Sequence, residues 1–157
     1  MFPEACYNHI MVTVTVLERK FNNLKIPLTE TAEELMRRRH VQNRALNIYI
    51  IGDSFMDKKG QSLLEQYRRV KNIRNKKNIS GFNVLSFSAP AGFPEPDIDA
   101  PAIGEIYLNP DYIKRSKENI TYLLIHGFLH LLGYDHGNDN DRIKMEKAES
   151  ELYKNLR

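Results

Sequence analysis

The sequence predicts an α+β fold, α/β-like in its element order, in which a four-stranded sheet is covered by helices. Four short segments with strand character alternate with segments that carry helical periodicity or helix caps, which is typical of this class. The chain has 157 residues, of which 41% are hydrophobic and 27% charged, as in an ordinary globular protein. We therefore expect a single domain over residues 1–157, whose strand order the pattern alone does not fix.

The amino-terminal half is expected to contribute two strands and two helices. Residues 9–18 predict a half-buried strand, because Val12, Val14 and Val16 alternate with Thr13 and Thr15. A threonine–glutamate capping box predicts a helix over residues 31–43. Residues 46–51 are apolar apart from Asn47, which is typical of a central strand buried on both faces. After a turn, a second helix is expected over residues 61–70.

Two further strands are expected in the carboxy-terminal half. Residues 71–81 are rich in asparagine and lysine and predict a loop, which leads into a third strand over residues 83–89. Prolines punctuate residues 90–101 and predict a second loop, after which residues 105–108 form the fourth strand.

Helices complete the chain. Pro110 is expected to open a short helical turn, and an apolar helix starts near Asn119. Asp139 and Asp141 offer amino-terminal caps for a last helix that ends near Leu156.

The run from His126 to His136 is the most informative part of the sequence. On a helix, His126 and His130 lie one turn apart and project from the same face. Gly133 can adopt the left-handed conformation that ends a helix, and the reversed chain then brings His136 toward the other two. Three imidazoles with a fourth position left for water predict a catalytic metal site, because four protein ligands normally close a structural zinc site. Imidazole ligands favour Zn²⁺, although nickel or copper suits the same donors.

Two other interpretations of these histidines are weaker. The helix that carries them is apolar nearly all round, so unpartnered imidazoles would be costly there, whereas His9 and His40 are expected to be ordinary structural or surface residues. Zincin-type metallopeptidases carry His-Glu-x-x-His, in which the glutamate activates water. Gly127 stands at the glutamate position, so a peptidase would lack its general base.

The complete histidine run resembles the signature of the YbeY family, bacterial metal-dependent endoribonucleases of ribosomal RNA maturation. The segments 83–87 and 103–106 are similar to the family's Asp-Val-Leu-Ser-Phe and Leu-Gly-Asp-Ile strands, and the Met145-Glu146…Glu149 pattern also matches. The resemblance covers most of the chain from about Leu46 onward. The departures are Asn83 and Glu105, where the family has aspartates, and an apparent insertion before Asn83.

This resemblance implies a mixed, mostly parallel sheet with the metal helix packed on one side. It also implies single-strand endoribonuclease activity in maturation of the 16S ribosomal RNA 3′ end and in ribosome quality control. The implied partners are ribosomal RNA, the small ribosomal subunit and associated assembly factors, with no DNA. A bound Zn²⁺ lowers the pKa of its water to about 7, which removes the need for a carboxylate base. Attack by hydroxide on phosphorus and activation of the 2′-OH both remain open.

A second cation is needed for the phosphate, and arginine suits phosphate geometry. Arg68 is the expected catalytic cation because Tyr67-Arg68 matches the family's Tyr-Arg, while Arg69, Lys71 and Arg74 are expected RNA contacts. Residues 68–77 hold six basic residues and no acid, a composition that is also typical of a solvated surface. Arg68 or Arg69 could therefore be no more than an exposed helix end.

The ring N–H of a ligand histidine needs an acceptor that fixes its tautomer. Asp135 and Glu105 are the candidates for this role, and each is equally typical of a turn or a strand edge. A non-catalytic ribosome-assembly factor, in which the metal only ties the helix to the next loop, remains the alternative function. A fourth protein ligand would favour that structural role.

Composition also predicts the compartment. A single cysteine, Cys6, excludes an intramolecular disulfide and is typical of a reducing compartment. The start of the chain has no signal-peptide pattern, and no apolar stretch reaches the ~20 residues of a membrane span. We therefore expect a cytoplasmic protein without a membrane partner. Residues 1–80 carry a net charge of +7 and residues 81–157 one of −4, which places the basic surface in the first half.

Overall fold

The computed structural model describes residues 10–55, 82–89 and 101–156, together with Ser62, Glu65 and Arg69. Its centre is a four-stranded sheet in the order β1-β2-β4-β3. β1 pairs with β2 and β2 with β4 in parallel, whereas β3 is antiparallel to β4. The strands are β1 (Met11–Val16), β2 (Ala45–Ile50), β3 (Val84–Ser88) and β4 (Ala102–Leu108). This confirms the expected mixed, mostly parallel sheet, with β2 in its interior.

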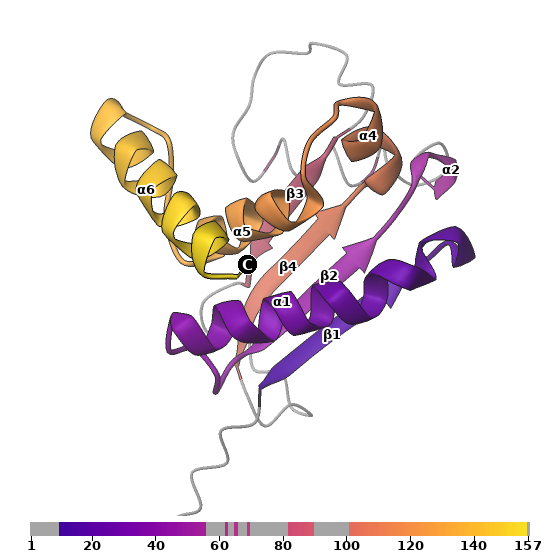
Figure 1. Cartoon of the computed structure of the whole chain (residues 1–157), viewed down its shortest axis with the longest axis horizontal. Coiled ribbons are helices and arrows are strands. Elements are labelled where there is room, and N and C mark those ends of the chain that lie inside the picture. Colours follow the sequence, from indigo (N-terminus) through magenta and orange to yellow (C-terminus); the bar gives the residue numbers. More distant parts are fainter. Residues whose placement is uncertain are drawn as a thin grey trace, which may run out of the picture.

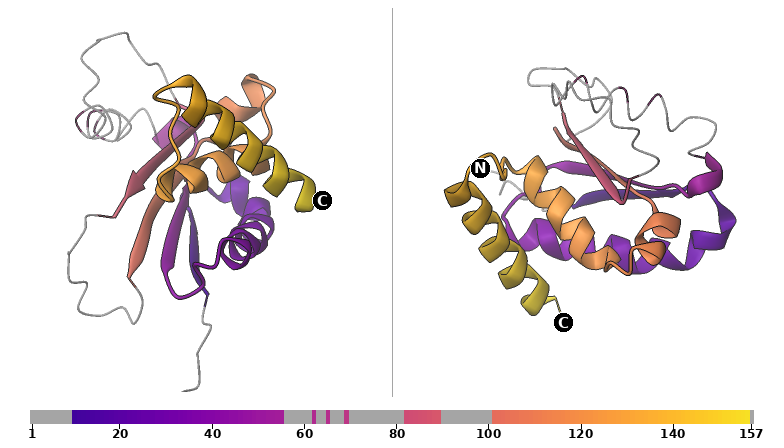
Figure 2. Two further views of the ribbon diagram at one scale, coloured as in Figure 1. Left: turned by 90° about the vertical axis from the view of Figure 1, so that its left-hand side faces the viewer. Right: turned by 90° about the horizontal axis from the view of Figure 1, so that it is seen from above.

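Helices cover one face of this sheet (Figures 1 and 2). α1 lies along β1, α5 lies over β3 and β4, and α6 packs on α5. The short elements η1, α2 and α4 sit at the strand ends. The bounds are η1 (Arg19–Leu24), α1 (Lys25–Arg38), α2 (Asp53–Phe55), α4 (Pro110–Arg115), α5 (Ile120–Leu131) and α6 (Asp139–Asn155). No helix in the described part of the chain is long and apolar enough to span a bilayer.

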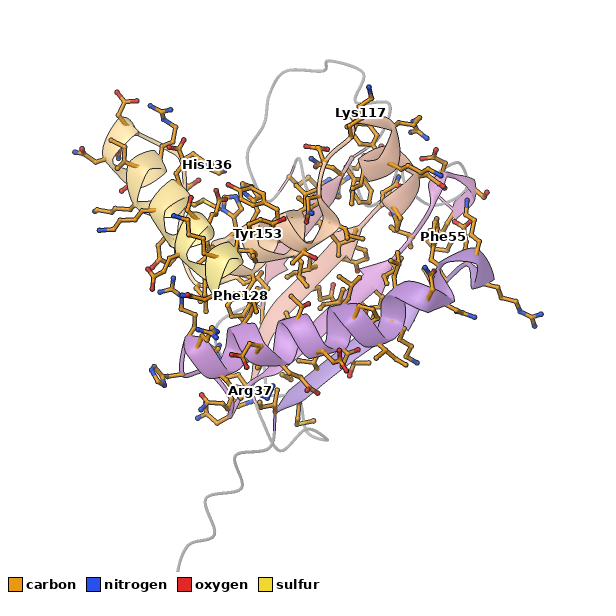
Figure 3. The ribbon with its side chains drawn as sticks, viewed as in Figure 1. Arg37, Phe55, Lys117, Phe128, His136 and Tyr153 are labelled. Atoms are coloured by element: carbon orange, nitrogen blue, oxygen red, sulfur yellow. The ribbon has the colours of Figure 1, made fainter. Side chains whose placement is uncertain are left out.

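The main core lies between the sheet and these helices. Alternate strand residues point into it, among them Val14 of β1, Ile48 of β2 and Ile106 of β4. They meet the buried side chains of α1 and α5, including Phe128 (Figure 3). The intervening strand residues point to the opposite face, where Tyr49 stacks on Tyr107 with ring centroids 4.8 Å apart. This alternation decides which strand residues can reach α5.

The predicted bounds of α1 are wrong at both ends. The helix begins at Lys25 rather than Thr31, whose hydroxyl donates to the Pro27 carbonyl at 2.8 Å instead of capping. Pro27 is tolerated because the N–H groups of a first helical turn have no intrahelical partner. The helix ends at Arg38 because His40 adopts the left-handed conformation with φ of 55°.

β4 begins three residues before the predicted start, because the ladder continues through Gly104. Gly104 has φ of 153°, and a Cβ there would lie 2.2 Å from the Phe87 carbonyl oxygen, so only glycine fits this approach. Of the helix predicted over residues 61–70, the described residues Ser62, Glu65 and Arg69 are helical. The predicted loops over residues 71–81 and 90–101 lie outside the described residues, except for Pro101.

Candidate metal centre

A cavity of about 730 Å³ lies between α5 and the edge strand β3. One end is formed by the start of α5, and the other by the turn that follows it. Most of the described residues that line it carry polar side chains, and the lining residues are Asn83, Val84, Ser86, Glu118, Asn119, Tyr122, Leu123, His126, Gly127, His130, Asp135 and His136. All three histidines of the sequence motif thus open into one cavity.

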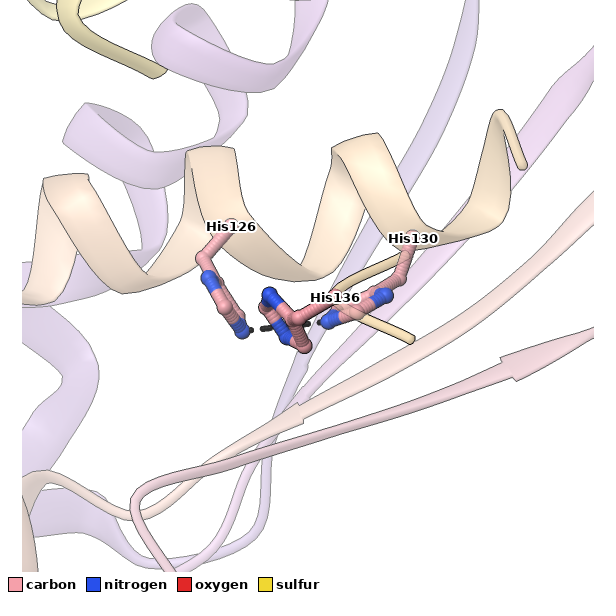
Figure 4. A group of neighbouring side chains, drawn as sticks. All are labelled: His126, His130 and His136. Carbon is pink, nitrogen blue, oxygen red and sulfur yellow. Dashed lines mark hydrogen bonds between the residues drawn. The ribbon is translucent and has the colours of Figure 1, made fainter. Parts of the chain in front are cut away.

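α5 places the first two histidines. Asn119 caps the helix by accepting from the Tyr122 backbone N–H at 3.0 Å, as the sequence predicts for its start. The rest of the helix is buried, so its register against the sheet is fixed by packing. His126 and His130 therefore project one turn apart from its cavity-facing side (Figure 4).

The turn after α5 returns the third histidine, as predicted. Gly133 has φ of 93°, and its N–H donates to the His130 carbonyl at 3.0 Å. The Tyr134 N–H donates to the Leu129 carbonyl at 3.0 Å, which completes a Schellman motif. The chain reverses here, and the Asp135 carboxylate accepts from the His136 backbone N–H at 2.8 Å. His136 consequently stacks on the His126 ring and meets the His130 ring edge-on, with ring centroids 5.1 and 4.6 Å apart.

The imidazole nitrogens converge. One ring nitrogen from each histidine lies within 4.8 Å of those of the other two, and the Nε2 atoms of His126 and His130 are 3.1 Å apart. Tetrahedral zinc with Zn–N bonds of about 2.0–2.1 Å separates its ligand nitrogens by roughly 3.3 Å. His136 is exposed, whereas His126 and His130 are half-buried, so the cluster opens to solvent on one side. This geometry suits one cation with an accessible coordination position.

The outward nitrogens of both helical histidines are engaged elsewhere. His130 Nδ1–H donates to the Tyr134 carbonyl at 2.9 Å, and His126 Nδ1–H donates to the Glu149 carboxylate at 2.6 Å. A neutral imidazole carries only one N–H, so both Nε2 atoms present lone pairs to the centre of the cluster. The close approach marked in Figure 4 is then between two acceptors, which is the arrangement that a shared cation stabilises.

Glu149 is an acceptor for His126 that the sequence did not predict. It lies on α6, is only 4% exposed, and also accepts from the Tyr122 hydroxyl at 2.5 Å. Burial and this hydrogen bond raise the pKa of Tyr122 to about 12. A signal was present in the sequence, because Glu149 interrupts the buried apolar stripe of α6 formed by Met145, Ala148 and Leu152.

Glu105 and Asp135 are the sequence candidates for accepting the ring N–H of a ligand histidine, and neither occupies the position that Glu149 takes. Glu105 lies on the sheet face opposite α5, where its carboxylate accepts from the Tyr107 hydroxyl at 3.0 Å. The expectation that it orients a ligand histidine is therefore wrong, because strand alternation points it away. Asp135 fixes the turn through its bond to the His136 backbone, as the turn interpretation predicts.

Gly127, at the position of the zincin glutamate, faces the sheet at close range. A Cβ at residue 127 would lie 3.1 Å from Val84 Cγ2 and 3.2 Å from Ile106 Cγ2. The helix thus packs tightly against the sheet at the position where zincins carry their general base. A glutamate here would be pressed onto the sheet.

The described part of the chain does not place the predicted phosphate-binding residues at the cavity. Arg68, Lys71 and Arg74 lie outside the described residues, and Arg69 is helical and exposed. Among the described lining residues there is no lysine or arginine. The four basic residues therefore stay a prediction.

Comparison with known proteins identifies relatives of this chain. A family model described as "Endoribonuclease YbeY" matches residues 18–157. A relative with that name from Nitrobacter hamburgensis is 40% identical over 85 residues, covering 47% of this chain and 44% of the relative. One from Francisella philomiragia is 35% identical over 94 residues, covering 55% and 59%. The chain thus spans about half the length of the curated relatives that it matches. A solution structure from Thermotoga maritima shares 22% identity over 94% of this chain and 92% of its own, with a TM-score of 0.47.

Proposed function

Since this chain belongs to the YbeY endoribonuclease family, we propose that it is a metal-dependent endoribonuclease acting on single-stranded RNA. The observation that carries the proposal is the convergence of three imidazole nitrogens within 4.8 Å of one another in a solvent-accessible cavity. Family membership supports the reaction, and the cavity supplies a place for it. We further propose that residues 1–157 act as one domain.

His126, His130 and His136 are the proposed ligands, and Zn²⁺ is the proposed ion. The donor set fits zinc because the Nδ1 protons of the two helical histidines are already bound by oxygen acceptors. Among the described residues, the cluster contains only these three donors. A bound ion would supply Lewis acidity toward water and a phosphoryl oxygen.

The chain's own polar residues would orient the RNA strand. The Asn83 amide donates to both oxygens of Glu118, at 3.1 and 3.2 Å, and Asn83, Glu118 and Ser86 line the cavity beside the histidines. Glu118 and Asp135, which are the carboxylates among the described residues of the wall, would repel a phosphate that is not neutralised. We propose that Arg68 provides the compensating cation, and that Arg69, Lys71 and Arg74 bind the flanking backbone.

The biological setting is proposed from the family. The substrate would be ribosomal RNA at the 3′ end of the 16S molecule, and the partners would be the small ribosomal subunit and its assembly factors, in the cytoplasm. Excess positive charge in the first half of the chain supports a polyanionic partner.

Replacing His130 tests the metal centre. Because a site of three ligands loses a third of its donors, the His130→Ala protein should lose bound zinc and RNA cleavage together. The measurements are metal content by mass spectrometry and cleavage of a single-stranded RNA, before and after chelation. His40→Asn is the matched control, since His40 is exposed at the end of α1 and asparagine tolerates its positive φ. Cleavage by metal-free protein would contradict the proposal.

Replacing Arg68 separates catalysis from metal binding. The Arg68→Ala protein should keep its zinc but cleave RNA about 100-fold more slowly or worse, because a cation that stabilises transition-state charge is removed. Arg19→Ala, at an exposed arginine of η1 that does not line the cavity, is the control and should cleave RNA as the parent does. Full zinc occupancy without RNA cleavage in the parent protein would instead favour the non-catalytic assembly factor.

A further inference from the structure

Glu149 occupies an environment that a carboxylate does not enter without compensation. It is 4% exposed and shares its helix face with the buried residues Met145, Ala148 and Leu152. An apolar residue at this position would simply extend the contact between α6 and α5. Burial of a carboxylate there costs free energy unless hydrogen bonds compensate it.

Both carboxylate oxygens of Glu149 are compensated, and both donors belong to α5. Oε1 accepts from His126 Nδ1–H at 2.6 Å, and Oε2 accepts from the Tyr122 hydroxyl at 2.5 Å. Tyr122 is itself held by an edge-on contact with Tyr153 of α6, with ring centroids 5.8 Å apart. Figure 3 shows Tyr153 on the side of α6 that faces α5. The carboxylate therefore has one fixed orientation.

That orientation has a chemical consequence for His126. A buried anionic acceptor at Nδ1 holds the single imidazole proton on that nitrogen. The Nε2 lone pair is then committed to the cavity, 3.1 Å from Nε2 of His130. The same contact limits rotation of the ring.

α6 is also connected to the cluster through the backbone. His136 lies three residues before Asp139, and Asn138 caps α6 by accepting from the Asp141 N–H at 3.0 Å. The last helix thus begins near His136, and further along it Glu149 contacts His126. A displacement of α6 would disturb two of the three histidines.

We propose that Glu149 is a positioning residue of the metal centre, which fixes the tautomer and orientation of His126 and makes cation affinity depend on the docking of α6. Tyr122 supports it by holding the second carboxylate oxygen. The inference rests on the proposed function only in requiring that the three histidines bind a cation, and it does not depend on the reaction.

The test uses the full chain and Zn²⁺, with affinity measured by chelator competition. Glu149→Ala should bind zinc about 10- to 100-fold more weakly than the parent, the range typical for loss of a hydrogen-bond partner behind a ligand histidine. Glu149→Gln should lose less, because its carboxamide oxygen can still accept from Nδ1–H. Tyr122→Phe should also lose less, because only one of the two bonds disappears. Glu151→Gln, an exposed position on the same helix, should bind zinc as the parent does.

A tautomer measurement separates positioning from general stabilisation. In metal-free parent protein, ¹⁵N chemical shifts of the imidazole should show His126 protonated at Nδ1. In Glu149→Ala, and to a smaller extent in Tyr122→Phe, the shifts should move toward a mixture of tautomers. Glu149→Gln has a side chain of nearly the same shape as glutamate, so the His126 tautomer can still be measured in this variant if the alanine variant does not fold.

Parent-like zinc affinity in folded Glu149→Ala would overturn the inference, and so would a His126 tautomer that is unaffected in all the variants. Absence of zinc binding by the parent would instead contradict the proposed function. Zinc binding without RNA cleavage would leave the role of Glu149 supported.

Discussion

At the scale of single residues, Gly127 separates this centre from that of a zincin. The residue sits between two proposed ligand histidines, where a Cβ would lie 3.1 Å from Val84 Cγ2 of β3 and 3.2 Å from Ile106 Cγ2 of β4. Any side chain at this position must displace Val84 or Ile106. Close packing therefore disfavours a glutamate at this position, and its absence also leaves the site without the general base of a zincin.

Gly127→Glu tests this explanation. We expect the free energy of unfolding to fall by about 1–3 kcal/mol through overpacking, with no gain of peptide hydrolysis. Urea denaturation and casein digestion measure the two effects. Gly137→Glu is the control, since a Cβ there would meet nothing within 4 Å. Casein digestion by Gly127→Glu would revive the peptidase interpretation.

At the scale of elements, the end of α5 assembles the centre. The left-handed conformation of Gly133 brings the Tyr134 carbonyl within hydrogen-bond distance of His130. It also turns the chain so that His136 meets the cluster. One backbone conformation therefore orients one proposed ligand and positions another.

Gly133→Ala should accordingly impair both folding and metal binding. A Cβ in the left-handed region costs about 1–2 kcal/mol, and relaxation of this strain would shift Tyr134 and His136. Thermal unfolding and zinc competition report the two losses. Gly137→Ala, with no steric contact, should show neither. Unchanged zinc affinity in Gly133→Ala would mean that the turn does not determine the site.

A second element-level contact joins the carboxyl ends of β2 and β4. Asp53 accepts from Arg115 and from the buried Asn109 amide, the latter at 3.1 Å. The hydrogen bond from Arg115 lowers the pKa of Asp53 below its ordinary value of 3.8. A carboxylate with a lowered folded-state pKa contributes stability above its unfolded pKa, and this contribution is lost as the pH falls through the folded value.

Asp53→Asn should therefore make the stability of the fold depend less steeply on pH in the acid range. Between about pH 5 and pH 2, the melting temperature of the parent should fall more steeply than that of the variant. Glu151→Gln serves as the exposed-carboxylate control. Parallel curves for the parent and Asp53→Asn would show that this contact does not contribute.

At the scale of the whole molecule, a bound cation would link α5 to the segment that leads into α6. A ligand that binds only the folded state stabilises it by mass action. With free zinc at 100 times its dissociation constant, the gain is about 2.7 kcal/mol. Differential scanning calorimetry should show a higher melting temperature with zinc, reversed by chelation. His130→Ala should show no such shift, and an equal shift in that variant would place the binding elsewhere.

The sequence alone determined the features that depend on residues close together in the chain. Helical spacing placed His126 and His130 on one face, Gly133 ended the helix, and alternation identified the buried side of β1. Local sequence signals predicted helix ends less accurately where two starting points were possible. The capping pattern at Thr31 lies inside α1, because the chain could already turn into a helix before Pro27.

Tertiary structure decided the contacts between distant segments. Glu149 and His126 are 23 residues apart and meet only because the apolar faces of α5 and α6 pack together. Glu105 is excluded from the centre because the paired strands fix which side of the sheet it faces. Local sequence selects backbone conformation through short-range sterics and hydrogen bonding, whereas the partner of a buried carboxylate is chosen by how whole elements pack.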